Sequence, residues 1–218
     1  MKYQDAEQLF TGERLETIRR VISNRQEDFT LILENVHDPH NIGAVLRTAE
    51  SVGLHEIYAL YTIESVDKIK KIAGHKSSSG AKKWLDIHLF TDTEKCFTEV
   101  RRKYRNIYAA YLSEDSQSLY DLDLNGPVAL LFGNEHRGVS PEALAASDGS
   151  FVIPQYGFTE SLNISVACAV SLYEGLRQRR ENGKYGNAFD IQKPFQKSLY
   201  IKYLEKSRPK VFGRDKIE

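Results

Sequence analysis

The stretch FTLILENVHDPHNIGAVLRTAES, residues 29–51, indicates the class of fold. Residues 29–36 are a short apolar run of the kind that forms a buried strand, and the DPHN sequence that follows favours a turn. The small and apolar residues after this turn predict a helix that packs on a core. The stretch therefore predicts a strand, a loop and a helix in succession, which is the unit from which α/β proteins are built.

The same plan recurs along the chain. Further strands are expected at residues 54–61, 85–90, 107–112, 127–132 and 151–153, and helices at residues 13–25, around Phe97 and Val100, after a Ser140 cap with Pro141, and at residues 162–180 with Ser161 as the cap. This alternation predicts an α/β fold with a mostly parallel sheet and helices on both faces. In such sheets, ligands bind at the carboxyl ends of the strands.

The length of the chain limits the number of domains, and the distribution of charge indicates possible binding partners. The 218 residues suit one α/β domain with short additions at its ends. Net charge is zero, but residues 176–218 hold 12 Lys or Arg against 5 Asp or Glu, and residues 68–83 hold 6 lysines in an expected loop. These segments could present a basic surface to a polyanion, or they could simply be solvated faces.

Other features concern the compartment. No apolar stretch is long enough to span a bilayer, and the first residues lack the pattern of a secretory signal. The two cysteines, Cys96 and Cys168, have no metal-ligand spacing. We therefore expect a cytoplasmic protein without a disulfide or a metal site.

Three segments share an apolar strand, a polar loop and a helix, namely DPHNIGAVLRTA, LFGNEHRGVSPE and IPQYGFTESLNISVA. In the first, Asn41 is expected to cap the helix and Arg47 to project from its second turn. On helix grounds Arg47 could be a surface arginine or a catalytic one, and Glu135 in the second could cap backbone groups or act as a base. The chain contains neither a P-loop nor a GxGxxG fingerprint, which argues against a Rossmann-type oxidoreductase.

In this order and spacing, the three segments resemble the three motifs of the SpoU branch of the SPOUT RNA ribose 2′-O-methyltransferases. The resemblance runs from about residue 13 to about residue 186. It implies an α/β sheet whose carboxyl-terminal part forms a trefoil knot around S-adenosylmethionine, and a homodimer as the working unit. Composition and periodicity do not predict a knot, because general topology rules argue against one.

The resemblance also implies roles for individual residues. The family's functional residues fall on Asn41, Arg47, Glu135, Ser161 and Asn163, and the methyl donor would be held around Leu112, Gly133, Asn134, Ile153 and Leu162. In this family the arginine is proposed to take the proton of the ribose hydroxyl. An arginine is almost never neutral in a protein, so stabilising the developing alkoxide and gripping a phosphate is the more economical role.

The substrate is a finer question. The chain resembles the tRNA branch that methylates guanosine 18 in the D-loop, with a basic helix in residues 1–28, the methyltransferase domain in residues 29–181 and a basic extension in residues 182–218. Contacts to RNA are expected from Arg14, Arg19, Arg20, His40, Arg177, Arg179 and Arg180. The third loop reads IPQYGFTESLN, with Gln155, Phe158 and Glu160, whereas that branch often carries methionines there, as in IPMxGMVQSLN, so ribosomal RNA stays an alternative substrate. A non-catalytic RNA-binding factor on the same fold is the alternative class.

Overall fold

A computed structural model describes residues 3–63, 80–159 and 161–208 of the chain. The basic loop expected at residues 68–83 lies mostly outside these residues. Two compact units are present: Met1–Glu27 together with Gly183–Glu218, which we call the terminal unit, and Asp28–Asn182, which we call the core unit. The segments before and after the expected domain therefore form one unit together.

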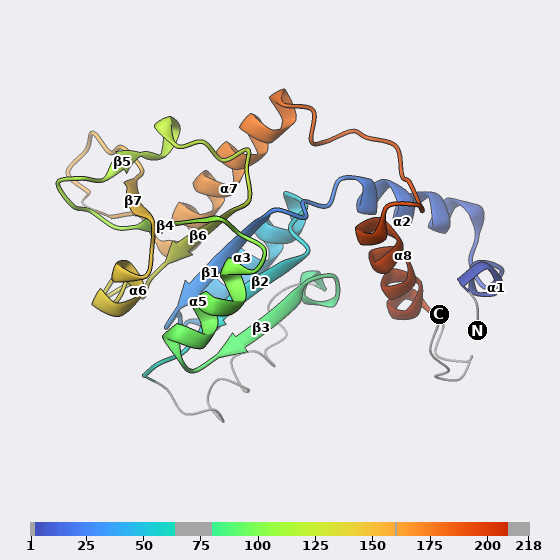
Figure 1. Ribbon diagram of the computed structural model, residues 1–218, viewed down its shortest axis with the longest axis horizontal. Helices are drawn as coiled ribbons and strands as arrows, with labels where there is room; N and C mark the ends of the chain where they lie inside the picture. Colours follow the sequence, from blue (N-terminus) through green and yellow to red (C-terminus); the bar gives the residue numbers. More distant parts are fainter. Residues whose placement is uncertain (1–2, 64–79, 160, 209–218) are drawn as a thin grey trace. The chain divides into compact units, whose positions relative to one another are not determined.

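The core unit contains a seven-stranded sheet in which every strand pair is parallel. The strands follow the order β3-β2-β1-β6-β4-β7-β5 (Figure 1). Their bounds are β1 Phe29–Glu34, β2 Glu56–Leu60, β3 Asp86–Phe90, β4 Asn106–Ala110, β5 Gln117–Ser118, β6 Val128–Phe132 and β7 Gly149–Val152. The parallel α/β class expected from the sequence is thus confirmed.

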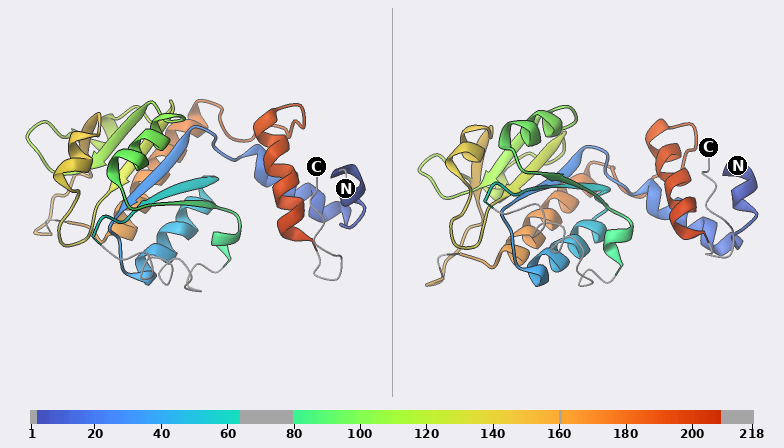
Figure 2. Two further views of the ribbon diagram at one scale, coloured as in Figure 1. Left: turned by 60° about the horizontal axis from the view of Figure 1, so that its bottom comes forward. Right: turned by 90° about the horizontal axis from the view of Figure 1, so that it is seen from below.

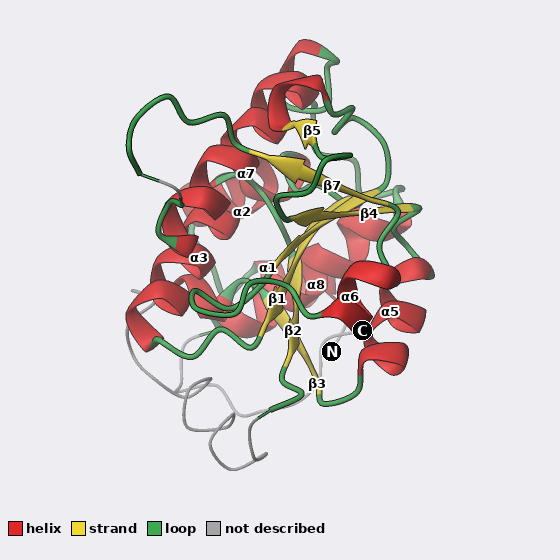
Figure 3. Ribbon diagram, turned by 90° about the vertical axis from the view of Figure 1, so that its left-hand side faces the viewer, coloured by secondary structure: helices red, strands yellow, loops and turns green. Residues whose placement is uncertain are grey.

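Helices cover both faces of this sheet (Figure 3). On one side lie α3, Pro39–Ser51, and α7, Ile164–Glu181, and on the other lie α5, Thr93–Arg101, and α6, Pro141–Ala145. Short 3-10 helices span Ala81–Lys83 and Leu119–Asp121. Every residue of β1 and β6 is buried, which explains their continuous apolar sequences.

Side chains of β1 alternate between two hydrophobic clusters. Leu31 and Leu33 join the cluster that includes α3 and α7, whereas Ile32 joins the one that includes α5 and α6. Successive side chains of a strand point to opposite faces of the sheet, so one apolar run can pack against the helices on both faces. The edge strand β3 is only partly buried, which confirms the half-exposed strand expected from its sequence, although the apolar Leu89 is itself 45% exposed.

The described part of the terminal unit contains the helices α1 Tyr3–Glu7, α2 Gly12–Ser23 and α8 Pro194–Ser207. Helix α8 packs against α1 and α2 (Figure 2). Buried Ile18 and Ile22 of α2 and Leu199 and Leu204 of α8 supply its apolar interior. The expected helix at residues 13–25 is therefore confirmed to within two residues.

No helix among the described residues is long and apolar enough to cross a membrane.

Candidate active site

The three motif loops meet because of the strand order. They follow β1, β6 and β7, and the loop around Leu112 follows β4. These four strands are neighbours in the sheet, in the order β1-β6-β4-β7. Since all of them run parallel, their carboxyl ends share one edge, and the four loops emerge side by side.

A chain of hydrogen bonds joins the three motifs at this edge. Asn41 of the first motif donates from Nδ2 to Oε1 of Glu135 in the second, over 2.8 Å. Asn163 of the third donates from Nδ2 to Oδ1 of Asn41, over 3.2 Å. Residues 94 and 122 positions apart in the sequence are thus connected. Of the five expected functional residues, the chain brings together these three.

The Asn163 side chain also fixes the start of helix α7. Its Oδ1 accepts from the backbone N–H of Ser165 at 2.9 Å and from the Ser165 hydroxyl at 2.6 Å. Asn163 is therefore the N-cap, and the prediction that Ser161 fills this role is wrong. Ser161 is exposed two residues before the cap. Because a cap side chain is held in place by the helix it starts, the same bonds orient the Nδ2 group toward Asn41.

The loop of the second motif is a tight hairpin. Backbone groups of Asn134 and Gly138 pair in both directions, at 3.0 and 2.8 Å, and Gly138 has φ +67°. A Cβ on Gly133 would lie 2.2 Å from backbone atoms of Gly138, so only glycine fits there. The Asn134 side chain accepts from the backbone N–H groups of His136 and Arg137. This hairpin presents Glu135 to solvent and to Asn41.

Two residues at the end of β1 support the hairpin, and the sequence analysis did not identify them. The buried Glu34 carboxylate accepts from the backbone N–H of Ser140, at 2.9 Å, where the hairpin ends. The carbonyl of Asn35, which has φ +52°, accepts from Nδ2 of Asn134 at 2.8 Å. An acid and an asparagine at the end of an apolar run, two residues before DPHN, are the signal that could have revealed them.

Helix α3 begins earlier than expected, and this changes where Arg47 lies. Asp38 is the N-cap, and its carboxylate accepts from the backbone N–H of His40 at 2.9 Å. The prediction that Asn41 caps the helix is wrong, and Arg47 belongs to the third turn. Proline at the first helical position favours the residue before it as the cap.

Arg47 lies on an exposed stripe of α3, together with His40, Ala44 and Ser51. Six residues separate it from Asn41, which corresponds to roughly 9 Å along the axis and a different face of the helix. The guanidinium therefore does not sit in the buried face of the helix, and it shares its stripe with His40, an expected RNA contact.

The residues expected to hold the methyl donor lie around the same edge. Leu112, just beyond β4, is 79% exposed, and Ile153 and Leu162 are partly buried. The hydroxyls of Ser113, Ser116 and Ser150 hydrogen-bond one another at 2.8 to 3.1 Å, and Ser116 also donates to the carbonyl of Tyr111. This cluster fixes the chain that carries Leu112.

Two buried groups near Glu135 are poor nucleophiles. Burial raises the pKa of Tyr61 to about 12, and the charge of Glu135 adds to the shift. Burial and the same charge raise the pKa of the Cys168 thiol. Both groups stay protonated near neutral pH, so neither thiolate nor phenolate is available there as a nucleophile. Within the described residues, no group of three or more His, Cys, Asp or Glu side chains could hold a metal ion.

Most of the expected RNA contacts remain at the surface, but one does not. Arg20, His40 and Arg180 are exposed, Arg177 pairs with Glu174 and Glu181, Arg14 donates to Ser207, and Arg19 pairs with Glu7. Arg179 is 0% exposed. It pairs with Asp28 and donates to the carbonyls of Leu124 and Gly126, so the prediction that it contacts RNA is wrong.

Comparisons with known proteins agree with this geometry. The model of the SpoU rRNA methylase family matches residues 28–173. A tRNA (guanosine(18)-2′-O)-methyltransferase from Thermus thermophilus is 40% identical over 175 residues, which cover 80% of this chain and 88% of the relative.

Solved structures give the same result. The crystal structure of the TrmH/SpoU tRNA modifying enzyme of Aquifex aeolicus matches with a TM-score of 0.76 at 31% identity, covering 91% of this chain and 98% of that one. The SpoU methyltransferase AviRb from Streptomyces viridochromogenes, in complex with the cofactor AdoMet, matches with a TM-score of 0.62 at 27% identity, covering 72% of this chain and 62% of that one. The match to the family model covers well over half of the sequence, and the chain therefore belongs to the SpoU rRNA methylase family.

Proposed function

We propose that this protein transfers a methyl group from S-adenosylmethionine to the ribose 2′-hydroxyl of guanosine 18 in tRNA. The observation that carries the proposal is the hydrogen-bonded chain from Glu135 through Asn41 to Asn163, which links all three family motifs at one edge of the sheet. The name of the Thermus thermophilus relative, tRNA (guanosine(18)-2′-O)-methyltransferase, supports the choice of RNA and nucleotide.

The edge beyond β4, β6 and β7 fits the methyl donor. Leu112 presents an exposed apolar side chain, Ile153 and Leu162 are nearby in the adjoining loops, and Gly133 brings the hairpin backbone close. Apolar side chains next to loop backbone groups suit an adenine ring with polar edges. AdoMet is bound in the AviRb structure, which belongs to a related methyltransferase. When bound, the sulfonium group supplies an activated methyl group.

The residues of the chain have two tasks in this reaction. Asn41, Glu135 and Asn163 hold the three loops in one arrangement. Together with Ser161 they orient the ribose, and this orientation supplies the larger part of the rate enhancement expected here. Arg47 stabilises the negative charge that develops on the 2′-oxygen as its proton leaves to solvent or to an RNA phosphate. A guanidinium stays charged throughout the accessible pH range, so it acts by charge and hydrogen bonding.

Charge distribution supports RNA as the substrate. The terminal unit holds 14 Lys or Arg against 9 Asp or Glu, whereas the core unit holds 16 against 21. A basic unit attached to an acidic one provides the electrostatic attraction to a phosphate backbone. Of the expected RNA contacts, Arg20 of this unit and His40, Arg177 and Arg180 of the core unit are exposed, and we propose that they contact RNA together with Arg14 and Arg19. We also propose a cytoplasmic location, where a tRNA substrate is found.

We further propose a homodimer and a carboxyl-terminal trefoil knot. Val166 and Tyr173 of α7 are 46% and 53% exposed, and their spacing of seven residues places them on one face of the helix. Such a face is suited to a second copy. For the knot, the support is the anchoring of α7 on the β4–β6 connection, where Gln178 bonds to Leu122 and Leu124 at 2.9 Å.

The experiment that tests the proposal compares methyl transfer from labelled S-adenosylmethionine to tRNA by the wild type, Arg47→Ala and Arg47→Lys. We expect at least a hundredfold loss of rate in Arg47→Ala, because removing one group that stabilises a developing oxyanion typically costs that much. Donor affinity, measured by calorimetry, should be unchanged. An undiminished rate contradicts the role of Arg47, and a wild type that binds no donor points to the non-catalytic RNA-binding alternative.

A further inference from the structure

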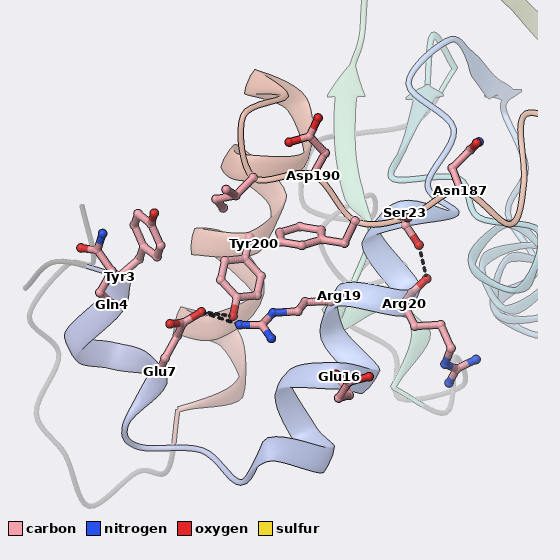
Figure 4. Close-up of a pocket in the computed structure, with 13 residues that line it drawn as sticks. Tyr3, Gln4, Glu7, Glu16, Arg19, Arg20, Ser23, Asn187, Asp190 and Tyr200 are labelled. Carbon is pink, nitrogen blue, oxygen red and sulfur yellow. Dashed lines mark hydrogen bonds and ion pairs between the residues drawn. The ribbon is translucent and has the colours of Figure 1, made fainter.

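The terminal unit contains a cavity of about 790 Å³, well separated in sequence from the motifs of the active site. Its lining comes from α1, α2, the middle of α8 and the segment before α8 (Figure 4): Tyr3, Gln4, Glu7, Glu16, Arg19, Arg20, Ser23, Asn187, Ala188, Phe189, Asp190, Ile191 and Tyr200. This volume lies within the range of pockets that hold small ligands, about 300 to 1,000 Å³.

One arginine in the cavity is held in a fixed position. Arg19 donates from Nη2 to Oε1 of Glu7 at 3.0 Å, and its guanidinium lies 5.7 Å from the centre of the Tyr200 ring. The Tyr200 hydroxyl donates to the same carboxylate oxygen. A guanidinium carries five N–H groups and the bond to Glu7 uses one of them, so others can donate to a ligand. A guanidinium fixed in this way is an organised donor, because little side-chain entropy is lost when it binds a ligand.

Aromatic rings stand beside this arginine. Phe189 lies 5.1 Å from Tyr200 between ring centroids, with a tilt of 47°, and Tyr3 lies edge-on at 6.3 Å. Tyr200 is 1% exposed, whereas Phe189 and Tyr3 are only partly buried. Part of the surface of these two rings is therefore available to a flat ligand.

Carboxylates complete the lining and restrict the class of ligand. Glu16 is exposed and has no partner among the described residues, and Asp190 uses Oδ1 to accept from the backbone N–H of Gln192. Three acids in one small cavity, Glu7 among them, repel a free anion such as phosphate, and the charged groups disfavour a wholly apolar ligand. Figure 4 shows that the Arg20 guanidinium points away from the Glu7–Arg19 pair, so it does not offset them.

A nucleobase matches all of these features. It has a flat face for aromatic side chains and an edge with both N–H donors and carbonyl or ring-nitrogen acceptors. Arg19 offers donors to such an edge, and Glu16 and Asp190 offer acceptors. The excess of basic residues in this unit attracts the phosphates on either side of the base.

We infer that this cavity binds one unpaired base of the substrate RNA, stacked on Phe189 and Tyr3 and hydrogen-bonded to Arg19. The inference rests on the proposed function, because it takes the bound RNA to be the RNA that the core unit methylates. The cavity gives the terminal unit a contact beyond the phosphate backbone, and such a contact selects RNAs in which a base is unstacked.

The test compares steady-state methylation of tRNA by the wild type, Phe189→Leu and Phe189→Tyr. Leucine keeps the apolar volume but removes the stacking face, and tyrosine keeps both. We expect the KM for tRNA to rise about tenfold in Phe189→Leu with kcat unchanged, since stacking on one aromatic side chain typically contributes an effect of this size. Phe189→Tyr should keep the wild-type KM. Lys193→Ala, which removes an exposed charge outside the cavity, should raise KM much less.

The outcomes separate this inference from the proposed function. If the wild type methylates tRNA and Phe189→Leu shows the wild-type KM, the cavity does not bind a base. Tyr3→Leu replaces Phe189→Leu if the latter unfolds at a lower temperature. If the wild type methylates no tRNA, the proposed function fails, and ultraviolet cross-linking of bound tRNA decides the inference. Cross-links at Tyr3 or Phe189 support it, and cross-links found only in the core unit overturn it.

Discussion

At the scale of single residues, Arg179 shows how burial changes the role of a charge. Its guanidinium pairs with Asp28, donates to three backbone carbonyls, those of Asp28, Leu124 and Gly126, and lies 4.6 Å from the centre of the Phe29 ring. It thereby ties the end of α7 to the start of β1 and to the segment before β6. A group with this many buried partners stabilises the fold and cannot reach RNA.

Replacing Arg179 by methionine should lower the free energy of unfolding by about 3 to 5 kcal/mol, because it leaves a partly buried carboxylate and buried carbonyls without their donor. Urea unfolding measures this loss. The neighbouring Arg180→Met is the matched control, since Arg180 is exposed and its loss should cost less than about 0.5 kcal/mol. Equal effects of the two substitutions contradict the structural role of Arg179.

The burial of Arg47 and of Arg179 could not be predicted from the neighbouring residues in the sequence. Arg47 stands in a run of small and apolar residues, yet it lies on the exposed stripe of α3 with His40 and Ser51. Arg179 stands in a basic stretch, yet it is buried, because Asp28, 151 residues away, is its partner. Local sequence shows the residue type, but burial depends on segments that only the fold brings together.

At the scale of elements, buried Glu56 connects β2 to β3 and to the turn that follows α5. It accepts from Tyr104 at 2.7 Å and from Lys103 at 2.9 Å, lies 2.9 Å from His88, and has Tyr58 and His55 nearby. Burial alone raises the pKa of a carboxyl, but the bonds from His88, Lys103 and Tyr104 outweigh it and hold the pKa of Glu56 well below its usual range.

A lowered pKa in the folded state fixes the sign of the pH dependence. The stabilisation by Glu56 is complete above the pKa of the unfolded chain, about 4.3, and is lost as pH falls below it. The free energy of unfolding should therefore decline less steeply between pH 4.5 and 3 in Glu56→Gln than in the wild type. Glu94→Gln, at an exposed position of α5, should keep the wild-type slope. Identical slopes in all three proteins contradict this account of Glu56.

Elements with a clear signal could be predicted, and those without one could not. The strands β1 and β6 are continuous apolar runs, the helices α2 and α5 have a clear period, and Ser140 with Pro141 marks the start of the short α6. The positions of these elements and of α7 agree with the sequence to within a few residues. The two residues of β5 and the five of α1 are too short to show a period. Both misplaced caps lie within three residues of the true ones, since Asp38 and Asn41, like Ser161 and Asn163, are all capping residue types.

At the scale of the whole molecule, the sequence indicated that the motif loops converge but not which side chains meet. Parallel strands imply a shared edge, whereas the bond from Asn41 to Glu135 depends on β6 lying between β1 and β4. Likewise, composition showed that both ends of the chain contain basic residues, but not that α2 and α8 pack together in one unit.

The proposed dimer makes a prediction at this scale. The chain has a mass of 24.9 kDa, and the wild type should sediment at about twice that value. Tyr173→Glu places a charge on the exposed face of α7 and should give the single-chain mass, because burying an unpaired charge in an interface is costly. Tyr120→Glu, at an equally exposed position outside α7, should remain dimeric. A wild type of 24.9 kDa rules out the dimer.

The central claim concerns one hydroxyl group, and one measurement addresses it most directly. Labelled S-adenosylmethionine is incubated with the protein and with two synthetic tRNAs, one with guanosine and one with 2′-deoxyguanosine at position 18. We predict methyl transfer to the first tRNA alone, at the ribose of guanosine 18, because only this substrate offers the hydroxyl that the Asn41, Glu135 and Asn163 site is built to orient. Equal labelling of both tRNAs, or labelling of ribosomal RNA alone, contradicts the account.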